Sequence, residues 1–326
     1  MTTDKQAEAV NFLKELAPEL KQFEREFREY LKSGIFLIDQ INRFMVKGQG
    51  KKLRPALAFL CAKMTGGITE LTMKAALIVE LLHNATLVHD DVVDNSDKRR
   101  GLPSVARIWR NKVAVLYGDY LLAHSLTAML EIRNMQVFDI LSVTARRLAK
   151  GELLQAAKAR KLDITEDVYL QMIADKTGAL ISASSELGGL TGGADGEQLK
   201  ALRNYGENWG MAFQIRDDIL DFIGREVILG KPVGGDVRER KITLPLIRAL
   251  SQASPREREG ILRLVKSRRG NSQVVDFVKR SDGIEYAMNK AQYFAQAAIG
   301  YLAGFPDNKE RRLLSQLADY SIRRNK

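Results

Sequence analysis

The chain has 326 residues, of which 45% are hydrophobic and 28% charged, and its net charge is +11. The single cysteine, Cys61, excludes an internal disulfide and fits a reducing compartment. The first residues lack the apolar core of a signal peptide and no run of 18 apolar residues occurs, so we expect a soluble, cytoplasmic protein. The positive charge suggests polyanionic partners, but no nucleic-acid-binding motif accompanies it, so we expect no nucleic acid.

Apolar residues recur at helical spacing along most of the chain, prolines are few, and no convincing alternating strand run appears. This pattern predicts an all-α protein. We expect helices over 8–32, 35–46, 55–65, 72–94, 105–132, 136–160, 165–189 and 195–223, the seventh interrupted at 176–178. A glycine-rich loop at 229–236 precedes four or five surface helices in 243–326. Because no low-complexity linker separates two halves, we predict a single domain over 1–326.

The helix over 72–94 ends in three carboxylates, Asp90, Asp91 and Asp94. Asp90 and Asp94 lie four residues apart and therefore on one face. Carboxylates at this end repel one another and oppose the helix dipole, so folding alone does not favour them. A solvated acidic helix end is the simple alternative, whereas a bound Mg²⁺ would favour the cluster because it takes oxygen ligands.

A second copy of the pattern makes the metal interpretation stronger. Asp217, Asp218 and Asp221 repeat the spacing at the end of the helix over 195–223. Two such helix ends facing one cavity would hold an anionic group between bridging metal ions.

Basic residues stand at helix breaks near both acid clusters. Lys51 and Arg54 lie at the start of a helix, which is a natural anion site. Arg99 and Arg100 follow the first acid cluster, and Lys231 lies in the glycine-rich loop after the second. Together they suit two diphosphates, one held through metal ions and one bound directly by arginine and lysine.

In its order of motifs, the sequence resembles the trans-type polyprenyl diphosphate synthases of the long-chain, hepta- or octaprenyl-like branch. The resemblance spans almost the whole chain, and one departure is Arg240, where the family often has glycine before the lysine matching Lys241. The matching motifs are Gly50-Lys51-x-x-Arg54-Pro55, His83, His89-Asp90-Asp91-x-x-Asp94, Arg99-Arg100-Gly101, Gly118-Asp119, Gly151-Glu152-x-x-Gln155, Lys176-Thr177, Phe213-Gln214-x-x-Asp217-Asp218-x-x-Asp221, Gly230-Lys231-Pro232, Asp236 and Lys241-x-Thr243-Leu244-Pro245.

The resemblance implies the isoprenoid synthase fold, a bundle of helices around a deep central cavity, usually in a homodimer. It also implies a head-to-tail condensation of isopentenyl diphosphate with an allylic diphosphate such as farnesyl or geranyl diphosphate. About three Mg²⁺ ions are expected, with Mn²⁺ as a substitute. By position, Asp90, Asp91, Asp94 and Asp217 would bind Mg²⁺ directly, and Asp218 and Asp221 mostly through water.

The same resemblance assigns the substrate-binding residues. Arg99, Lys176, Lys231 and Lys241 would contact the allylic diphosphate, and Lys51, Arg54, His83 and Arg100 would hold isopentenyl diphosphate. Breaking the allylic C–O bond gathers charge on the leaving diphosphate, where cations stabilise the transition state. Thr177 and the Gln214 amide oxygen would face the carbocation. Taken alone, His83 could equally be a hydrogen-bonded core histidine.

Two small residues, Ala85 and Thr86, stand five and four positions before Asp90, where short-chain relatives carry an aromatic plug. We therefore expect a tunnel past them, with Leu126, Met129 or Leu130 at its floor, and a long-chain product of the size used as a quinone tail. Transient contact with a membrane surface would release such a product. The alternatives are a short-chain farnesyl or geranylgeranyl diphosphate synthase, a terpene cyclase, or a non-catalytic partner subunit. The clean second acid motif and Lys51 with Arg54 argue against a cyclase, and the retained aspartates argue against a non-catalytic subunit.

Overall fold

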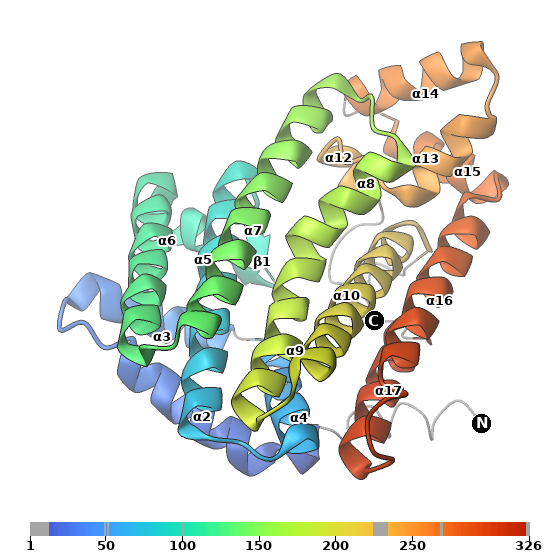
Figure 1. Ribbon diagram of the computed structural model, residues 1–326. Helices are drawn as coiled ribbons and strands as arrows, with labels where there is room; N and C mark the ends of the chain where they lie inside the picture. The colour runs from blue at the N-terminus through green and yellow to red at the C-terminus, as the bar shows by residue number, and fades with distance from the viewer. Residues whose placement is uncertain are drawn as a thin grey trace. The chain divides into compact units, whose positions relative to one another are not determined.

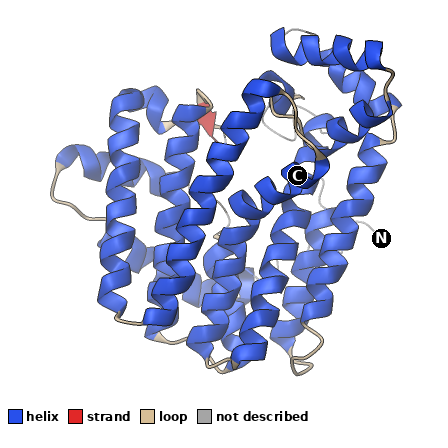
Figure 2. Cartoon of the chain, turned by 45° about the horizontal axis from the view of Figure 1, so that its top comes forward, coloured by secondary structure: helices blue, strands red, loops and turns tan. Residues whose placement is uncertain are grey.

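The structure is a computed structural model that describes residues 13–48, 50, 52–99, 101–223, 234–267 and 270–323. Within these ranges the chain is almost entirely helical (Figure 2), so the predicted all-α class is confirmed. A short antiparallel hairpin, β1 (Lys98–Arg99) with β2 (Leu102–Pro103), was not predicted. Strands of two residues are too short to give an alternating pattern.

The chain divides into two compact units by its internal packing. Unit 1 comprises Met1–Ala145, Leu180–Arg203 and Leu302–Gln316, and unit 2 comprises Arg146–Ala179, Asn204–Tyr301 and Leu317–Lys326. The single domain over 1–326 stays a prediction.

Unit 1 is built around α5 (Glu70–Val93), the helix that ends in the first acid cluster (Figure 1). A capping box fixes its start: the Thr69 hydroxyl accepts from the Thr72 N–H and the Thr72 hydroxyl from the Thr69 N–H. Its window of greatest hydropathy is long and apolar enough to cross a membrane, but 72% of that window is buried inside the structure, which identifies α5 as a core helix. The other described helices of this unit are α2 (Ala17–Tyr30), α3 (Phe36–Lys47), α4 (Leu53–Thr65), α6 (Val105–Ile132), the first part of α7 (Met135–Lys161), most of α9 (Ala179–Gly192), and the first parts of α10 (Gly196–Ile223) and α17 (Lys309–Arg323).

Glycines let α9 lie unusually close to α4. A Cβ atom on Gly188 would overlap the Ala58 carbonyl oxygen and lie 2.8 Å from Cys61 Cβ, and one on Gly192 would overlap Thr65 Oγ1. The helix pair therefore packs backbone against backbone, without room for a methyl group.

Unit 2 is organised around the C-terminal part of α10 (Gly196–Ile223), which ends in the second acid cluster. Ile215, Ile219 and Phe222 of this helix are fully buried in the apolar core of the unit. The remaining described elements are the second part of α7 (Met135–Lys161), α8 (Glu166–Ile173), the π-helix η1 (Ala174–Gly178), α12 (Gly235–Arg238), α13 (Leu244–Gln252), α14 (Pro255–Ser267), α15 (Asn271–Arg280), α16 (Gly283–Tyr301) and the end of α17 (Lys309–Arg323).

Most predicted helices are confirmed within one to three residues. The interruption expected at 176–178 is the π-helix η1, and five helices occupy the C-terminal region as expected. Their description as surface helices was wrong for α13, six of whose nine residues are buried, whereas α16 buries one face through Ala287, Ala291 and Ala295 and exposes the other. The buried face of α16 consists of alanine and glycine, so the sequence shows no strong apolar pattern there. Of the first predicted helix, residues 8–12 lie outside the described ranges.

We predict opposite effects for one methyl group at two helical glycines. Gly188→Ala should lower the free energy of unfolding by about 1–3 kcal/mol, because the added carbon overlaps the α4 backbone. Gly260→Ala on α14, where nothing lies within 4 Å of the added carbon, should raise it by about 0.5–1 kcal/mol. Thermal unfolding followed by circular dichroism compares the two, and shifts of the same sign would contradict the close packing of α9 on α4.

Candidate active site

The first acid cluster presents its carboxylates in two different environments. Asp91 is only 3% exposed and accepts a hydrogen bond from Arg99 Nε at 2.8 Å, whereas Asp90 and Asp94 are half-buried. Arg99 lies on β1, so the unpredicted hairpin brings this arginine back over the end of α5. Asp91 therefore forms an ion pair with Arg99. Asp90 and Asp94, four residues apart, share one face at the end of α5.

The structure brings together Arg54 and His83, two residues predicted to bind isopentenyl diphosphate. Arg54 Nη1 lies 2.9 Å from His83 Nε2. Because a guanidinium only donates, the imidazole accepts at Nε2. His83, Asp91 and Arg99 also line one small pocket of about 40 Å³, with Phe44 and Leu102 among its walls. Lys51 and Arg100 lie outside the described residues.

The second acid cluster, in unit 2, has three distinct environments. Asp217 is exposed. Asp218 is only 5% exposed and accepts hydrogen bonds from the Tyr169 hydroxyl at 2.6 Å and from Gln214 Nε2 at 2.8 Å. Asp221 accepts from the backbone N–H groups of Gly235 at 3.0 Å and Asp236 at 3.1 Å, and so holds the first turn of α12.

Crowding of carboxylates changes the acidity of this cluster. Burial raises the pKa of Asp218 to about 7, helped by Asp217 and Asp221 and opposed by the hydrogen bonds from Tyr169 and Gln214. Desolvation, together with Asp218 and Asp221, also raises the pKa of Asp236 well above its usual range. A cation near these groups would relieve both effects by favouring the charged carboxylates.

The π-helix η1 places Lys176 and Thr177, both predicted site residues, against Gln214 and α7. Thr177 Oγ1 donates to Gln214 Oε1 at 2.7 Å. Lys176 forms an ion pair with Glu152 and lies 3.5 Å from Gln155 Oε1. Glycine at position 151 allows the approach, because a Cβ there would lie 3.1 Å from the Lys176 backbone nitrogen.

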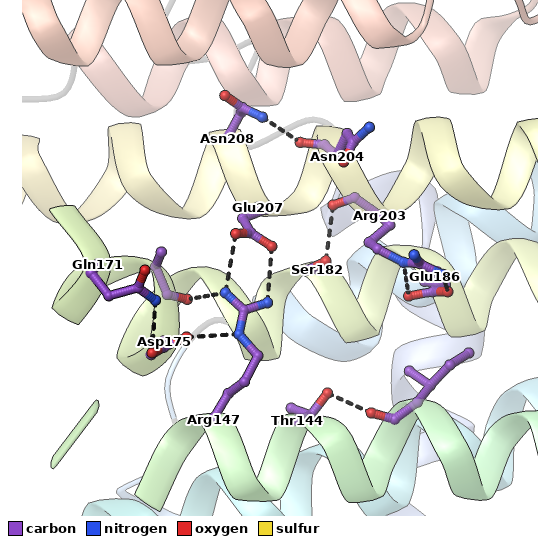
Figure 3. A network of polar contacts seen from close by, with 12 residues as sticks. Thr144, Arg147, Gln171, Asp175, Ser182, Glu186, Arg203, Asn204, Glu207 and Asn208 are labelled. Carbon is purple, nitrogen blue, oxygen red and sulfur yellow. Dashed lines mark hydrogen bonds and ion pairs between the residues drawn. The ribbon is translucent and has the colours of Figure 1, made fainter. Parts of the chain in front are cut away.

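Arg147 clamps the π-helix in place, as Figure 3 shows. Its Nε donates to Asp175 Oδ1 at 2.8 Å, its Nη1 and Nη2 donate to the two Glu207 carboxylate oxygens at 2.9 and 3.0 Å, and Nη2 also reaches the Ala174 carbonyl at 3.2 Å. Burial would raise the pKa of Asp175, but the hydrogen bonds from Arg147 and Gln171 outweigh it and hold this pKa below its usual range. π-Helical turns recur at functional sites, and this one positions Lys176 and Thr177.

One cavity of about 130 Å³ in unit 2 collects several predicted residues. Lys176, Thr177, Gln214, Asp218 and Lys241 all line it. The sequence analysis did not single out five further lining residues, Lys158, Tyr169, Asp236, Arg240 and Thr243, as site residues. Lys241 also forms an ion pair with Glu239 at 2.6 Å. Lys231 lies outside the described residues.

The residues predicted to set product length lie on α5. Ala85 is buried, and the half-buried Thr86 donates its hydroxyl to the His83 carbonyl at 2.9 Å. Of the three predicted floor residues on α6, Met129 is buried, whereas Leu126 and Leu130 are 52% and 70% exposed. These two leucines belong to an exposed apolar face of α6.

The acid clusters fit a metal that needs few protein ligands. Within the described ranges, no three histidine, cysteine or acidic side chains already converge as a metal site. Mg²⁺ usually takes one or two carboxylates and completes its shell with water and substrate phosphates, which the Asp90–Asp94 pair and the exposed Asp217 suit. An all-α chain with two such acid-ended helices and a lysine-lined cavity has the features of the isoprenoid synthase class.

Comparisons with known proteins agree with this class. A family model described as Polyprenyl synthetase matches residues 36–315. The octaprenyl diphosphate synthase of Escherichia coli is 34% identical over 301 residues, covering 91% of this chain and 93% of that protein. The geranylgeranyl diphosphate synthase of Saccharolobus solfataricus is 35% identical over 311 residues, covering 92% and 94%.

A solved structure is similar over nearly the whole length. A polyprenyl synthase from Caulobacter crescentus, complexed with calcium and isoprenyl diphosphate, superposes with a TM-score of 0.92 at 34% identity, covering 98% of each chain. The chain therefore belongs to the polyprenyl synthetase family, and the resemblance seen in its motifs is confirmed.

The raised pKa of Asp218 predicts a pH-dependent stability. The folded state keeps a proton on this group, up to about pH 7, that the unfolded state has already released, so Asp218 destabilises the metal-free fold as the pH rises through this window. In the presence of a chelator, Asp218→Asn should therefore raise the unfolding temperature clearly at pH 8 and much less at pH 5. Asp276→Asn, at an exposed position of α15, is the control. A larger gain at pH 5 than at pH 8 would contradict the assignment.

Proposed function

We propose that this protein is a Mg²⁺-dependent trans-polyprenyl diphosphate synthase that condenses isopentenyl diphosphate with an allylic diphosphate. The observation that carries the proposal is the unit 2 cavity. Lys176, Thr177, Gln214 and Lys241 line it together with the buried Asp218. In each round a C–O bond of the allylic diphosphate breaks, a C–C bond to isopentenyl diphosphate forms, and a proton and diphosphate leave.

The unit 2 residues have roles that follow from their charge. Lys176 and Lys241 stabilise the charge that gathers on the departing diphosphate. Thr177 and Gln214 present oxygen atoms, and Thr177 holds the amide orientation through its 2.7 Å hydrogen bond. When bound, Mg²⁺ adds further positive charge at the leaving group.

Two carboxylates, Asp218 and Asp236, line this cavity. Asp218 is held by hydrogen bonds from Tyr169 and Gln214 and is assigned with its cluster to metal binding, and Asp236 is desolvated beside it. The released diphosphate is therefore the proposed acceptor of the final proton.

Isopentenyl diphosphate is assigned to the basic residues of unit 1. Arg54 and His83, 2.9 Å apart, provide donors for one phosphate, and Lys51 and Arg100 are assigned here from their motif positions. Arg99 is assigned to the allylic diphosphate. Its ion pair with Asp91 suggests that Asp91 also orients this arginine, beside the metal-binding role expected from the motif.

Long-chain products are the favoured outcome, of the size used in quinone side chains. The similarity to an octaprenyl diphosphate synthase supports this, as do the small residues at positions 85 and 86. The similarity to a geranylgeranyl diphosphate synthase supports a short-chain enzyme as the second candidate. Product length in an assay with farnesyl diphosphate, isopentenyl diphosphate and Mg²⁺ separates the two, and the absence of prenyl products would reject both.

A homodimer in the cytoplasm is also proposed. The exposed apolar side chains of α6 support it, because a second copy of the chain would remove them from water. These side chains are Ile108, Val115, Leu116, Leu122, Leu126 and Leu130. A long polyprenyl product is insoluble in water, so transient contact with a membrane surface is proposed for its release.

Removing one carboxylate from either acid cluster should abolish most turnover. Asp90→Ala and Asp217→Ala should each lower kcat by about two to four orders of magnitude, because each removes a charged oxygen ligand at the leaving-group site. Asp139→Ala, an exposed position of α7, is the matched control and should keep wild-type turnover. Formation of prenyl products at the wild-type rate in either acid variant would reject these clusters as metal sites.

A bulky side chain at position 85 should shorten the product. Ala85→Phe should shift the products to about fifteen or twenty carbons, a volume effect on an otherwise intact site. Ala85→Ser, which adds little volume, should keep the wild-type length. Chromatography of dephosphorylated products measures both, and unfolding curves establish that the phenylalanine variant is folded. If the folded variant makes wild-type lengths, Ala85 does not border the growing chain.

A further inference from the structure

The turn after α12 ends in a backbone conformation that normally selects glycine. The Lys241 N–H donates to the Asp236 carbonyl at 2.8 Å and the Arg240 N–H to the Val237 carbonyl at 3.1 Å, which is the hydrogen-bond pair of a Schellman motif. Arg240 is the left-handed residue of this motif, with φ +59°. Glycine is usual here because a Cβ disfavours this conformation, so an arginine needs another reason to occupy the position.

Arg240 belongs to the lining of the unit 2 cavity, beside Lys176 and Lys241. Its Nε atom is buried and has no hydrogen-bond partner in the described part of the chain. A buried donor without an acceptor is unfavourable, and native structures rarely keep one unless a ligand, water or ion completes it.

Thr243 shows the same departure from its usual local role. It is the N-cap residue of α13, where a threonine hydroxyl normally accepts from the first helical turn, yet it makes no side-chain cap hydrogen bond. The side chain is only 5% exposed, lines the same cavity, and its Oγ1 has no partner among the described residues. Two neighbouring residues thus give up locally favoured arrangements and leave donors at one cavity.

We propose that Arg240 and Thr243 are two further diphosphate-binding residues of this cavity, with Arg240 Nε–H and the Thr243 hydroxyl donating to phosphate oxygens. The inference rests on the proposed function and extends it by assigning two additional ligand contacts.

An anion is the chemistry that the cavity favours, because Lys158, Lys176, Arg240 and Lys241 all line it beside Asp218 and Asp236. Three of these cations also pair with Asp163, Glu152 and Glu239, but those carboxylates lie outside the lining. A guanidinium also suits phosphate oxygens through directed N–H groups.

The backbone strain at Arg240 allows an experiment that separates the stability of the fold from ligand binding. Arg240→Gly removes the guanidinium and relieves the strain at once, so this variant should unfold at the same or a higher temperature than wild type. Its Kd for inorganic diphosphate with Mg²⁺, measured by calorimetry, should nevertheless rise about tenfold or more. Arg133→Gly is the matched control, because Arg133 is an exposed arginine with φ +51° at the C-cap of α6. This control should gain stability and keep the wild-type Kd.

A second pair of variants isolates the hydroxyl. Thr243→Val should raise the diphosphate Kd several-fold, and Thr243→Ser, which restores the hydroxyl, should recover most of it. Repeating the titrations with a non-cleavable farnesyl thiolodiphosphate distinguishes the source of the diphosphate. Weaker binding of both probes assigns the contacts to the allylic substrate, and weaker binding of inorganic diphosphate alone assigns them to the released product.

Three results would overturn the inference. If wild type makes prenyl products and Arg240→Gly binds both probes within twofold of wild type, Arg240 is not a ligand and the proposed function stands. If wild type binds neither probe and makes no product, the proposed function fails together with the inference. Arg240→Lys, which keeps the charge but not the Nε–H, should show an intermediate Kd, and a wild-type Kd for this variant would reject the Nε–H contact.

Discussion

Burial of a carboxylate, close to other carboxylates, is the constraint on which the second unit depends. Asp218 is buried next to Asp217 and Asp221, and its pKa is raised to about 7. Hydrogen-bond donors compensate these carboxylates. The Tyr169 hydroxyl and the Gln214 amide donate to Asp218, and two backbone N–H groups donate to Asp221. The helix that carries these acids is anchored by the fully buried apolar side chains of Ile215, Ile219 and Phe222, so the unfavourable end is held by favourable packing along the same element.

Irregular backbone appears where the cavity needs particular side chains. The π-helix η1 presents Lys176 and Thr177 to the cavity, and the left-handed turn presents Arg240. Polar contacts hold both irregular segments in place. Arg147 binds the Asp175 carboxylate of η1 and the Glu207 carboxylate of α10. Asp221 accepts from the backbone of α12, the helix that leads into the left-handed turn. Strained or unusual backbone persists when its surroundings over-determine it, and here those surroundings are ion pairs and capped N–H groups.

Local patterns in the sequence were enough for the helices and the acid clusters, because both depend on spacing within one element. The break at 176–178 was likewise visible, although its π-helical form was not. The Arg147 clamp was not foreseen, since its partners lie 28 and 60 residues away and each is an ordinary charged residue of a helix. The hairpin that carries Arg99 was missed because four residues carry no period. The sequence showed Arg240 as a departure from the family pattern. Only the structure shows that this arginine has a positive φ angle and lines the cavity.

The buried acid also fixes the orientation of the Gln214 amide, one turn earlier on α10. Because Asp218 accepts from Gln214 Nε2, the amide oxygen of Gln214 must point the other way, where Thr177 donates to it. An amide reversed by half a turn would put its oxygen against a carboxylate and its NH₂ against a hydroxyl that can still accept, losing one bond and adding a repulsion. The negative end of the amide dipole is therefore fixed toward η1. In the proposed reaction the electron-poor allylic carbon needs such an oxygen, so the charge of Asp218 reaches the chemistry through the orientation of Gln214.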